Sequence, residues 1–366
     1  MTIASCYRQA LCAFVLSLWA LHACARTPHD DLRGRLDRLV PDVLAQQRIA
    51  SVSVAHLDHG RLTLAAAWGK AAPDAAATPR TLYNIASMTK PITAETVLRL
   101  VAQHRIALDA PMAPVWTDPD IADDPRRALL TPRLSLSHRT GFPNWRYETD
   151  GKLRFLRTPG ETFGYSGEGF EYLRRYVETK TGRTLDALAN AQVFAPAGMR
   201  ETAYTRQPWF AGRMAIPHDG DGTPLPPQIA ERALASDEVW STPRDYARFL
   251  VSLMRRQRVP ASLVAERMRI QTDRKAELCA SPKVTHCPDE AGIGLGWEVF
   301  RFGTHRYLMH TGMDAGTFTL GYFSPDTGRG TVIFTNSSHG PQAVLPILDA
   351  IGEDREFVEF LRALAG

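Results

Sequence analysis

Ser87 and Lys90 have the residue types and the spacing of a nucleophile and its base. They lie three residues apart at the start of a segment whose apolar residues Ile92, Val97 and Leu98 recur at helical spacing. Residues i and i+3 share one face of a helix, so the hydroxyl and the amine come within reach of each other. The positive end of the helix dipole and desolvation both disfavour a charged amine, so we expect Lys90 to accept the Ser87 proton during acyl transfer. The same residues also fit an ordinary helix start, with Ser87 as N-cap and Lys90 in solvent.

The Ser87–Lys90 segment belongs to the first of six motifs that occur in a fixed order along the chain. They are Tyr83–Pro91 (YNIASMTKP), Leu136–Phe142 (LSHRTGF), Phe163–Gly167 (FGYSG), Ser241–Asp245 (STPRD), Gly294–Trp297 (GLGW) and His310–Gly312 (HTG). A single Ser-x-x-Lys match is weak evidence, but six motifs in one order are specific. Together they resemble the serine β-lactamase and penicillin-binding-protein superfamily, in particular its branch of class C β-lactamases, esterases and D-aminopeptidases. The resemblance extends from about Leu32 to Ile351.

The resemblance implies a role for each matching residue. Ser87 would be the acylated nucleophile, Lys90 its base, and Tyr165 the general acid that protonates the leaving group and helps to activate water. The backbone N–H groups of Ser87 and Met313 would form the oxyanion hole, and Gly312 would leave room for the substrate. No cofactor or metal is implied.

Two positions depart from the family pattern and bear on the substrate. His310, next to Thr311, stands where the family often has Lys, and a neutral imidazole weakens the binding of a substrate carboxylate. Gly167 stands where an Asn would contact an acylamide group. Small esters or amides are therefore favoured over β-lactams as substrates. The missing Asn also motivates an alternative, a degenerate module that binds peptidoglycan peptides or a protein partner without turnover.

The elements that must position these residues are an antiparallel sheet and a helical insertion. Short β-suited runs occur near both chain ends, at 50–56, 61–68, 298–302, 306–310, 317–323 and 331–335. Helical patterns occur at 169–181, 185–193, 344–351 and 356–364. We expect an α+β fold in which a five-stranded antiparallel sheet, built from both chain ends, is flanked by helices. Residues 26–106 and 240–366 would form an α/β lobe, and residues 107–239 an inserted helical lobe.

Composition excludes several other classes of protein. The 366 residues carry a net charge of +4 and no basic block, which argues against a nucleic-acid partner. Glu168 stands where a Gly-x-Ser-x-Gly nucleophile elbow needs its second Gly. His56 and His59 lack the companions of a zinc motif, and residues 219–222 hold too few acids for an EF-hand.

The N-terminal segment predicts export. Arg8 precedes an apolar run at 10–21 that is too short to span a bilayer, as in a secretory signal peptide over residues 1–25. Release after Ala25 would give a periplasmic protein, whereas residues 21–24 also resemble a lipobox that would leave Cys24 as a lipid anchor. No transmembrane segment follows. An oxidising compartment would favour a disulfide between Cys279 and Cys287, the alternative being two free surface thiols.

Overall fold

The computed structural model describes residues 28–365. The expected signal peptide over residues 1–25 and the alternative lipid anchor at Cys24 lie outside the described residues. Within residues 28–365, no helix combines the length and the apolar character needed to cross a membrane.

A nine-stranded antiparallel sheet forms the centre of the molecule, in the order β3-β2-β1-β11-β10-β9-β8-β7-β6. Its strands are β1 (Ser51–Asp58), β2 (Arg61–Ala72), β3 (Ala75–Ala76), β6 (Thr272–Asp273), β7 (Glu290–Ile293), β8 (Glu298–Phe302), β9 (His305–Asp314), β10 (Thr317–Phe323) and β11 (Gly330–Thr335). The N-terminal β1 pairs with the C-terminal β11, so the sheet is built from both chain ends as predicted. The prediction of five strands was wrong, since the sheet has nine. Six of them correspond to the six β-suited runs, and the other three, β3, β6 and β7, span only two to four residues and carry no readable alternation.

The hairpin between β1 and β2 follows directly from its turn residues. His59 and Gly60 have φ angles of 48° and 67°. A two-residue turn with positive φ at both positions matches the right-handed twist of the strands it joins. Glycine adopts a positive φ without steric cost, so Gly60 allows the tight turn without backbone strain. The runs at 50–56 and 61–68 therefore pair as one antiparallel hairpin.

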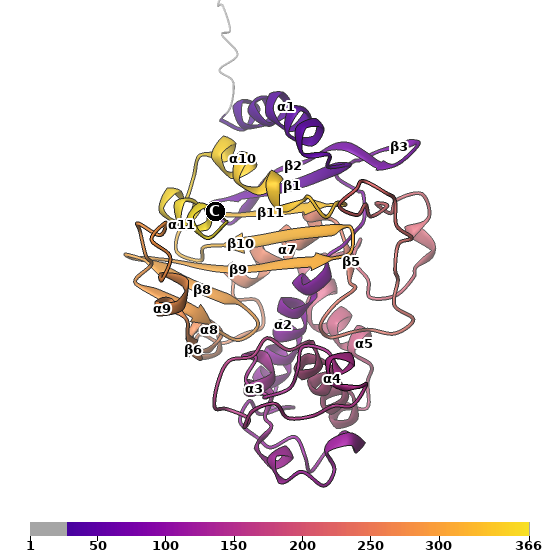
Figure 1. The fold of residues 1–366 in the computed structure, drawn as a ribbon, viewed down its shortest axis with the longest axis vertical. Helices are drawn as coiled ribbons and strands as arrows, with labels where there is room; N and C mark the ends of the chain where they lie inside the picture. The colour runs from indigo at the N-terminus through magenta and orange to yellow at the C-terminus, as the bar shows by residue number, and fades with distance from the viewer. Residues whose placement is uncertain (1–27, 366) are drawn as a thin grey trace, which may run out of the picture.

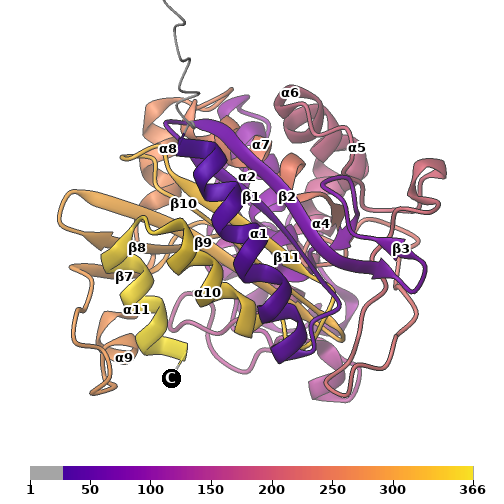
Figure 2. The same cartoon turned by 90° about the horizontal axis from the view of Figure 1, so that it is seen from above.

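Helices cover both faces of the sheet. One face carries α1 (Pro28–Gln47), α10 (Pro341–Ile351) and α11 (Arg355–Ala365), which Figure 2 shows crossing in front of the strands. The other face carries α7 (Pro243–Met254) and α2 (Thr89–Ala102), which separates the sheet from the remaining helices (Figure 1). Because both faces are covered, every residue of β10 and of β11 is buried.

The segment between α2 and β5 consists of short helices and long loops. It contains α3 (Pro132–Leu136), α4 (Gly167–Thr181), α5 (Leu185–Ala189), a π-helical turn η5 (Asn190–Phe194), α6 (Ala195–Ala197) and the 3₁₀ turns η2 (Pro119–Ile121), η3 (Pro125–Leu129), η4 (Arg146–Thr149) and η6 (Pro208–Phe210). A two-stranded sheet of β4 (Tyr83–Asn84) and β5 (Trp240–Ser241) joins the two ends of this region. Two further helices, α8 (Ala261–Met268) and α9 (Lys275–Leu278), follow α7.

Helix α2 lies at the junction of these parts and is buried along nearly its whole length. Its residues from Thr89 to Leu100 are all buried. Three of them, Lys90, Glu95 and Arg99, have ionisable side chains. Glu95 Oε1 accepts from Arg99 Nε at 3.0 Å, and Glu95 Oε2 accepts from Arg267 Nη2 at 2.7 Å. All three side chains are at most 2% exposed. The pairing therefore ties α2 to α8 at a site where an isolated charge would be costly.

Removing the shared carboxylate should destabilise the fold strongly. We expect Glu95→Ala to lower the free energy of unfolding by about 3–5 kcal/mol, because Arg99 and Arg267 would remain buried without a counter-charge. Glu359→Ala is the control, since Glu359 pairs with Arg362 at the surface and should cost at most about 1 kcal/mol. Denaturant unfolding measures both changes, and equal small losses would contradict the interpretation.

Candidate active site

A strained turn presents Ser87 at the start of α2. The 3₁₀ turn η1 (Ala86–Met88) precedes the helix, and Ala86 has a φ of 46°, in the left-handed region that residues with a Cβ seldom adopt. Asn84 Oδ1 accepts a hydrogen bond from Ala86 N at 2.8 Å and so supports this conformation. Ser87 is partly exposed, whereas both of its neighbours in η1 are buried. Strain of this kind is concentrated where a side chain must be held for chemistry.

Lys90 holds its amino group next to the Ser87 hydroxyl. The side chain is fully buried, and Nζ lies 2.9 Å from Ser87 Oγ and 2.9 Å from the carbonyl oxygen of Ser236. The aromatic rings of Tyr165 and Phe170 face Nζ with their centroids at 4.8 and 5.8 Å. A hydrogen bond of this length can carry the Ser87 proton to the amine, which is the geometry a general base requires. The structure thus brings Ser87, Lys90 and Tyr165 together.

Tyr165 is held by His138, a residue of the His-x-x-Gly segment. The two rings stack with centroids 4.3 Å apart, and Tyr165 remains 38% exposed on its other side. His138 Nδ1 accepts from Ser166 N at 3.1 Å, so this nitrogen carries no hydrogen. Burial, reinforced by the nearby Lys90 and His310, holds the pKa of His138 well below its usual value. His138 is therefore a neutral platform that fixes the Tyr165 ring against Lys90.

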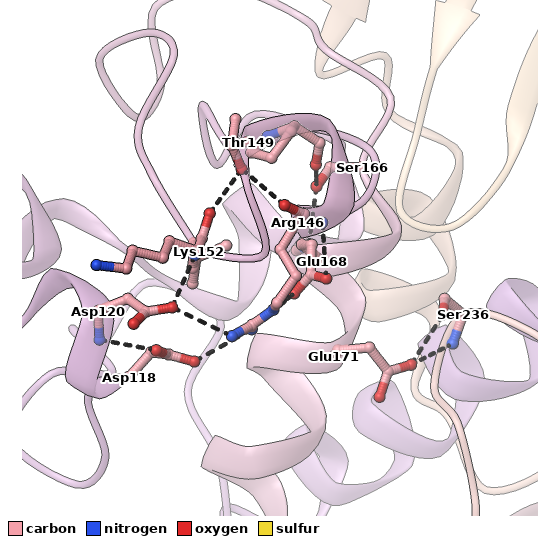
Figure 3. Close-up of polar contacts among 12 residues, drawn as sticks. Asp118, Asp120, Arg146, Thr149, Lys152, Ser166, Glu168, Glu171 and Ser236 are labelled. Carbon is pink, nitrogen blue, oxygen red and sulfur yellow. Dashed lines mark hydrogen bonds and ion pairs between the residues drawn. The ribbon is translucent and has the colours of Figure 1, made fainter.

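The amino group of Lys90 is also held through Ser236, which Glu171 of α4 fixes in place. Glu171 Oε1 accepts from both Ser236 N, at 3.1 Å, and Ser236 Oγ, at 2.8 Å, as Figure 3 shows. Arg174 Nε donates to the second oxygen of Glu171 at 2.8 Å. These contacts immobilise the Ser236 residue whose carbonyl accepts from Lys90 Nζ. Sequence reasoning missed both Glu171 and Ser236, because neither belongs to a recognisable motif.

His310 faces the same place from β9 and is fixed in one tautomer. Its side chain is 6% exposed, and Nδ1 lies 2.6 Å from the carbonyl oxygen of Thr311. A carbonyl only accepts, so Nδ1 carries the hydrogen and Nε2 presents a lone pair. Burial, followed by the repulsion from Lys90, lowers the pKa of His310 to about 3. The imidazole is therefore neutral at physiological pH and offers no positive charge to a substrate.

Gly312 allows β9 to approach the turn that bears Ser87. A Cβ at this position would lie 2.3 Å from the Ile85 carbonyl oxygen and 2.4 Å from Thr319 Oγ1. Only glycine avoids this overlap, so the strand can pack directly on η1. Met313 follows it and lines one cavity with Ser87. The assignment of the Ser87 and Met313 N–H groups to an oxyanion hole stays a prediction.

Gly167 begins α4, and its missing side chain is replaced by an aromatic ring. A Cβ here would lie 2.7 to 3.0 Å from three ring atoms of Trp145. The Gly167 N–H donates to Asn144 Oδ1 at 2.9 Å. The segment that carries Trp145 is anchored by its neighbour Arg146, which pairs with Glu168 at 2.8 Å, as Figure 3 shows. The space of the family's Asn is therefore filled by indole, and an Asn could enter only if Trp145 moved.

The predicted catalytic residues Ser87 and Tyr165 face a cavity of about 540 Å³. Ser87, Tyr165, His310, Thr311 and Met313 line it. Its acidic lining was not predicted from the sequence and consists of Asp237, Glu238, Glu298 and Asp314. The predicted cysteine pair lies elsewhere, between α9 and β7, where Cys279 and Cys287 form a disulfide with Cα atoms 5.8 Å apart. Among the described residues, no group of three or more His, Cys, Asp or Glu side chains could hold a metal ion.

The Glu171 contacts predict a positioning role that activity can reveal. We expect Glu171→Ala to slow acylation of Ser87 by about 10²-fold, because Ser236 and hence Lys90 Nζ would lose their fixed position. Glu171→Gln keeps an acceptor for Ser236 and should retain most of the rate. The measurement is the rate of labelling by an active-site serine probe under native conditions.

Glu178→Gln is the matched control for these variants. Glu178 lies on the same helix and pairs with the same Arg174, at 2.7 Å, but has no contact with Ser236. Its rate should stay within about 3-fold of the parent, since Gln keeps an oxygen that can accept from Arg174 and the substitution leaves the Glu171–Ser236 contact in place. If Glu178→Gln slowed acylation as much as Glu171→Ala, the effect would come from Arg174 rather than from Ser236.

Comparison with known proteins agrees with this geometry. A family model described as Beta-lactamase matches residues 36–353. Esterase EstB of Burkholderia gladioli is 31% identical over 227 residues, which are 53% of this chain and 57% of EstB, so the match spans little more than half of that relative. The D-alanyl-D-alanine-carboxypeptidase/endopeptidase AmpH of Escherichia coli (strain K12) is 23% identical over 357 residues, 91% of each chain.

The fold is shared with a protein of known structure. The octameric penicillin-binding protein homologue from Pyrococcus abyssi superposes with a TM-score of 0.73 at 19% sequence identity, covering 87% of this chain and 76% of the other. At this identity the likeness concerns the fold alone. The family model, however, matches most of the chain and includes the Ser87–Lys90 turn, the Tyr165 segment and the His310 strand. The chain therefore belongs to the beta-lactamase family.

Proposed function

We propose that this protein is a serine hydrolase that cleaves small esters or amides through an acyl-enzyme on Ser87. The observation that carries the proposal is the 2.9 Å contact between Lys90 Nζ and Ser87 Oγ, made by a fully buried lysine that also contacts Ser236. A lysine that served only as a solvated surface charge would not be buried against a serine hydroxyl and a backbone carbonyl oxygen. An amine that removes the hydroxyl proton explains the arrangement better.

The first half of the reaction forms the acyl-enzyme. Ser87 Oγ attacks the substrate carbonyl carbon while its proton passes to Lys90 Nζ. The carbonyl oxygen becomes an oxyanion, which the N–H groups of Ser87 and Met313 would stabilise. When the bond to the leaving group breaks, the Tyr165 hydroxyl donates a proton to the departing oxygen or nitrogen, and Lys90 can return the proton to Tyr165.

The second half releases the acid. Water attacks the acyl carbon and gives its proton to the Tyr165–Lys90 pair, and Ser87 Oγ takes a proton back as it leaves. Tyr165 suits both steps because its ring lies against Lys90 Nζ and its other side is open to the cavity. The exposed position lets solvent reach the acyl bond.

Two features of the cavity favour simple esters or amides over β-lactams. Neutral His310 supplies no fixed positive charge for a lactam carboxylate. Trp145 fills the space next to Gly167, where an amide side chain would otherwise contact the acylamide group. The relatives include an esterase and a carboxypeptidase/endopeptidase, which agrees with ester and amide substrates.

A direct comparison of substrates tests this proposal. The chain without residues 1–25 should hydrolyse p-nitrophenyl butyrate and should turn over a chromogenic cephalosporin much more slowly. Ser87→Ala should lose at least about 10³-fold in kcat/KM, because the nucleophile is removed. Ser262→Ala, an exposed serine on α8, is the control and should keep full activity.

The outcomes separate the alternatives. Fast cephalosporin turnover would show a β-lactamase and contradict the preference for esters and amides. Ester turnover that survives in Ser87→Ala would contradict the nucleophile. Silence on both substrates, with no labelling by a serine probe, would favour a module that binds peptides or a protein partner without turnover.

We further propose that the protein is exported to the periplasm. The support is the Arg8-led apolar run at 10–21, the small residues before position 26 and a disulfide, which persists in an oxidising compartment. We expect mass spectrometry of protein expressed from the whole gene to show a chain that begins at residue 26. A chain that begins at a lipidated Cys24 would show the anchored form, and an intact Met1 would refute export.

A further inference from the structure

Four carboxyl groups from distant parts of the chain converge on the catalytic cavity. Asp237 and Glu238 precede β5, Glu298 begins β8, and Asp314 ends β9. These acids line one cavity with Ser87 because of the fold, since the first, Asp237, and the last, Asp314, lie 77 positions apart in the chain. The site thus collects negative charge where a substrate must lie.

None of these four carboxyl groups forms an ion pair with any residue of the described range 28–365. Their printed hydrogen bonds are local, from Glu238 N to Asp237 Oδ1 at 2.8 Å and from Ala315 N to Asp314 Oδ1 at 2.7 Å. No lysine or arginine lines the cavity in the part of the chain that the structure describes. The acids around Arg146, by contrast, are paired, since Arg146 contacts Asp118 and Glu168.

His310 provides a second, independent indication of the ligand. It is 6% exposed and lines the cavity, and its Nδ1 is already engaged by the Thr311 carbonyl. No hydrogen bond to Nε2 forms among the described residues, so its lone pair can accept one from a ligand in the cavity.

The charges themselves are incompletely compensated. Burial raises the pKa of Asp237 to about 7 and that of Glu298 to about 6, although Lys90 and Arg274 respectively act in the opposite direction. Lys90 can offset at most one negative charge, and its amino group is committed to Ser87 and Ser236. A bound cation would stabilise the ionised carboxyl groups, since opposite charge favours the charged form.

We propose that the substrate carries an ammonium group, which the negative charge of these four carboxyl groups attracts into the cavity and which can donate a hydrogen bond to His310 Nε2 while Ser87 attacks the carbonyl carbon. This inference rests on the proposed function, because it concerns the substrate of that same site. It assigns Asp237, Glu238, Glu298 and Asp314 to substrate selection. An anionic substrate is excluded by the same charges that attract a cation.

A matched series of esters tests the charge preference. The acyl chains are 6-aminohexanoate, heptanoate and the monoester of pimelate, each as the p-nitrophenyl ester, so that only the terminal group changes from ammonium to methyl to carboxylate. We expect kcat/KM to fall in that order, with the ammonium ester about 10-fold or more above the methyl ester at low ionic strength. The difference should shrink as salt is added, because the attraction is electrostatic.

Charge-removing variants locate the effect in the cavity. Glu298→Gln and Asp314→Asn keep the size of each side chain and should each lower the ratio of ammonium ester to methyl ester turnover. Asp42→Asn is the control, since Asp42 is an exposed acid on α1, on the other face of the sheet. It removes the same charge from the protein and should leave the ratio unchanged.

Each result bears on one proposal. If the methyl or carboxylate ester is hydrolysed as well as the ammonium ester, the charge preference is overturned while the hydrolase remains. A ratio that falls equally in Asp42→Asn would assign the preference to net charge and would also overturn it. If no ester is hydrolysed and no serine probe labels Ser87, the proposed function itself fails.

Discussion

The burial of one amino group organises the centre of this protein. Lys90 is completely enclosed, so the interior must supply acceptors for its Nζ. Among the described residues, Ser87 Oγ and the Ser236 carbonyl oxygen do so at hydrogen-bond distance. Each acceptor is then fixed in turn, Ser87 by the left-handed turn at Ala86 and Ser236 by the carboxylate of Glu171. A network in which every member is satisfied is rigid, and rigidity is what a nucleophile and base need.

A second constraint is the burial of charge in α2. Both Lys90, in its first turn, and Glu95, near its middle, are buried. Glu95 is held between two arginines, and this pairing anchors the helix behind Lys90. The cavity beside Ser87 differs, since its four carboxyl groups form no ion pair among the described residues. The scaffold therefore neutralises its own charges and leaves those at the substrate site available.

Local chemistry was readable from the sequence wherever neighbours in the chain are neighbours in space. The separation of Ser87 and Lys90 by three residues predicts their contact, and the turn at Gly60 predicts the first hairpin. The strands at both chain ends and the order of the motifs predict the α+β fold. Edge strands as short as β3 and β6 were not predicted, because two residues show no alternation and their pairing depends on the neighbouring strand.

The sequence by itself determined the family and predicted the contact between Ser87 and Lys90, because these depend on residue types at short, fixed spacing. Only the tertiary structure decided the surroundings that select a substrate. Trp145 fills the space beside Gly167, and Glu298 and Asp314 line the same cavity as Asp237, through contacts between segments far apart in the chain. Such contacts depend on how helices and strands pack rather than on local propensity, so no pattern along the chain records them.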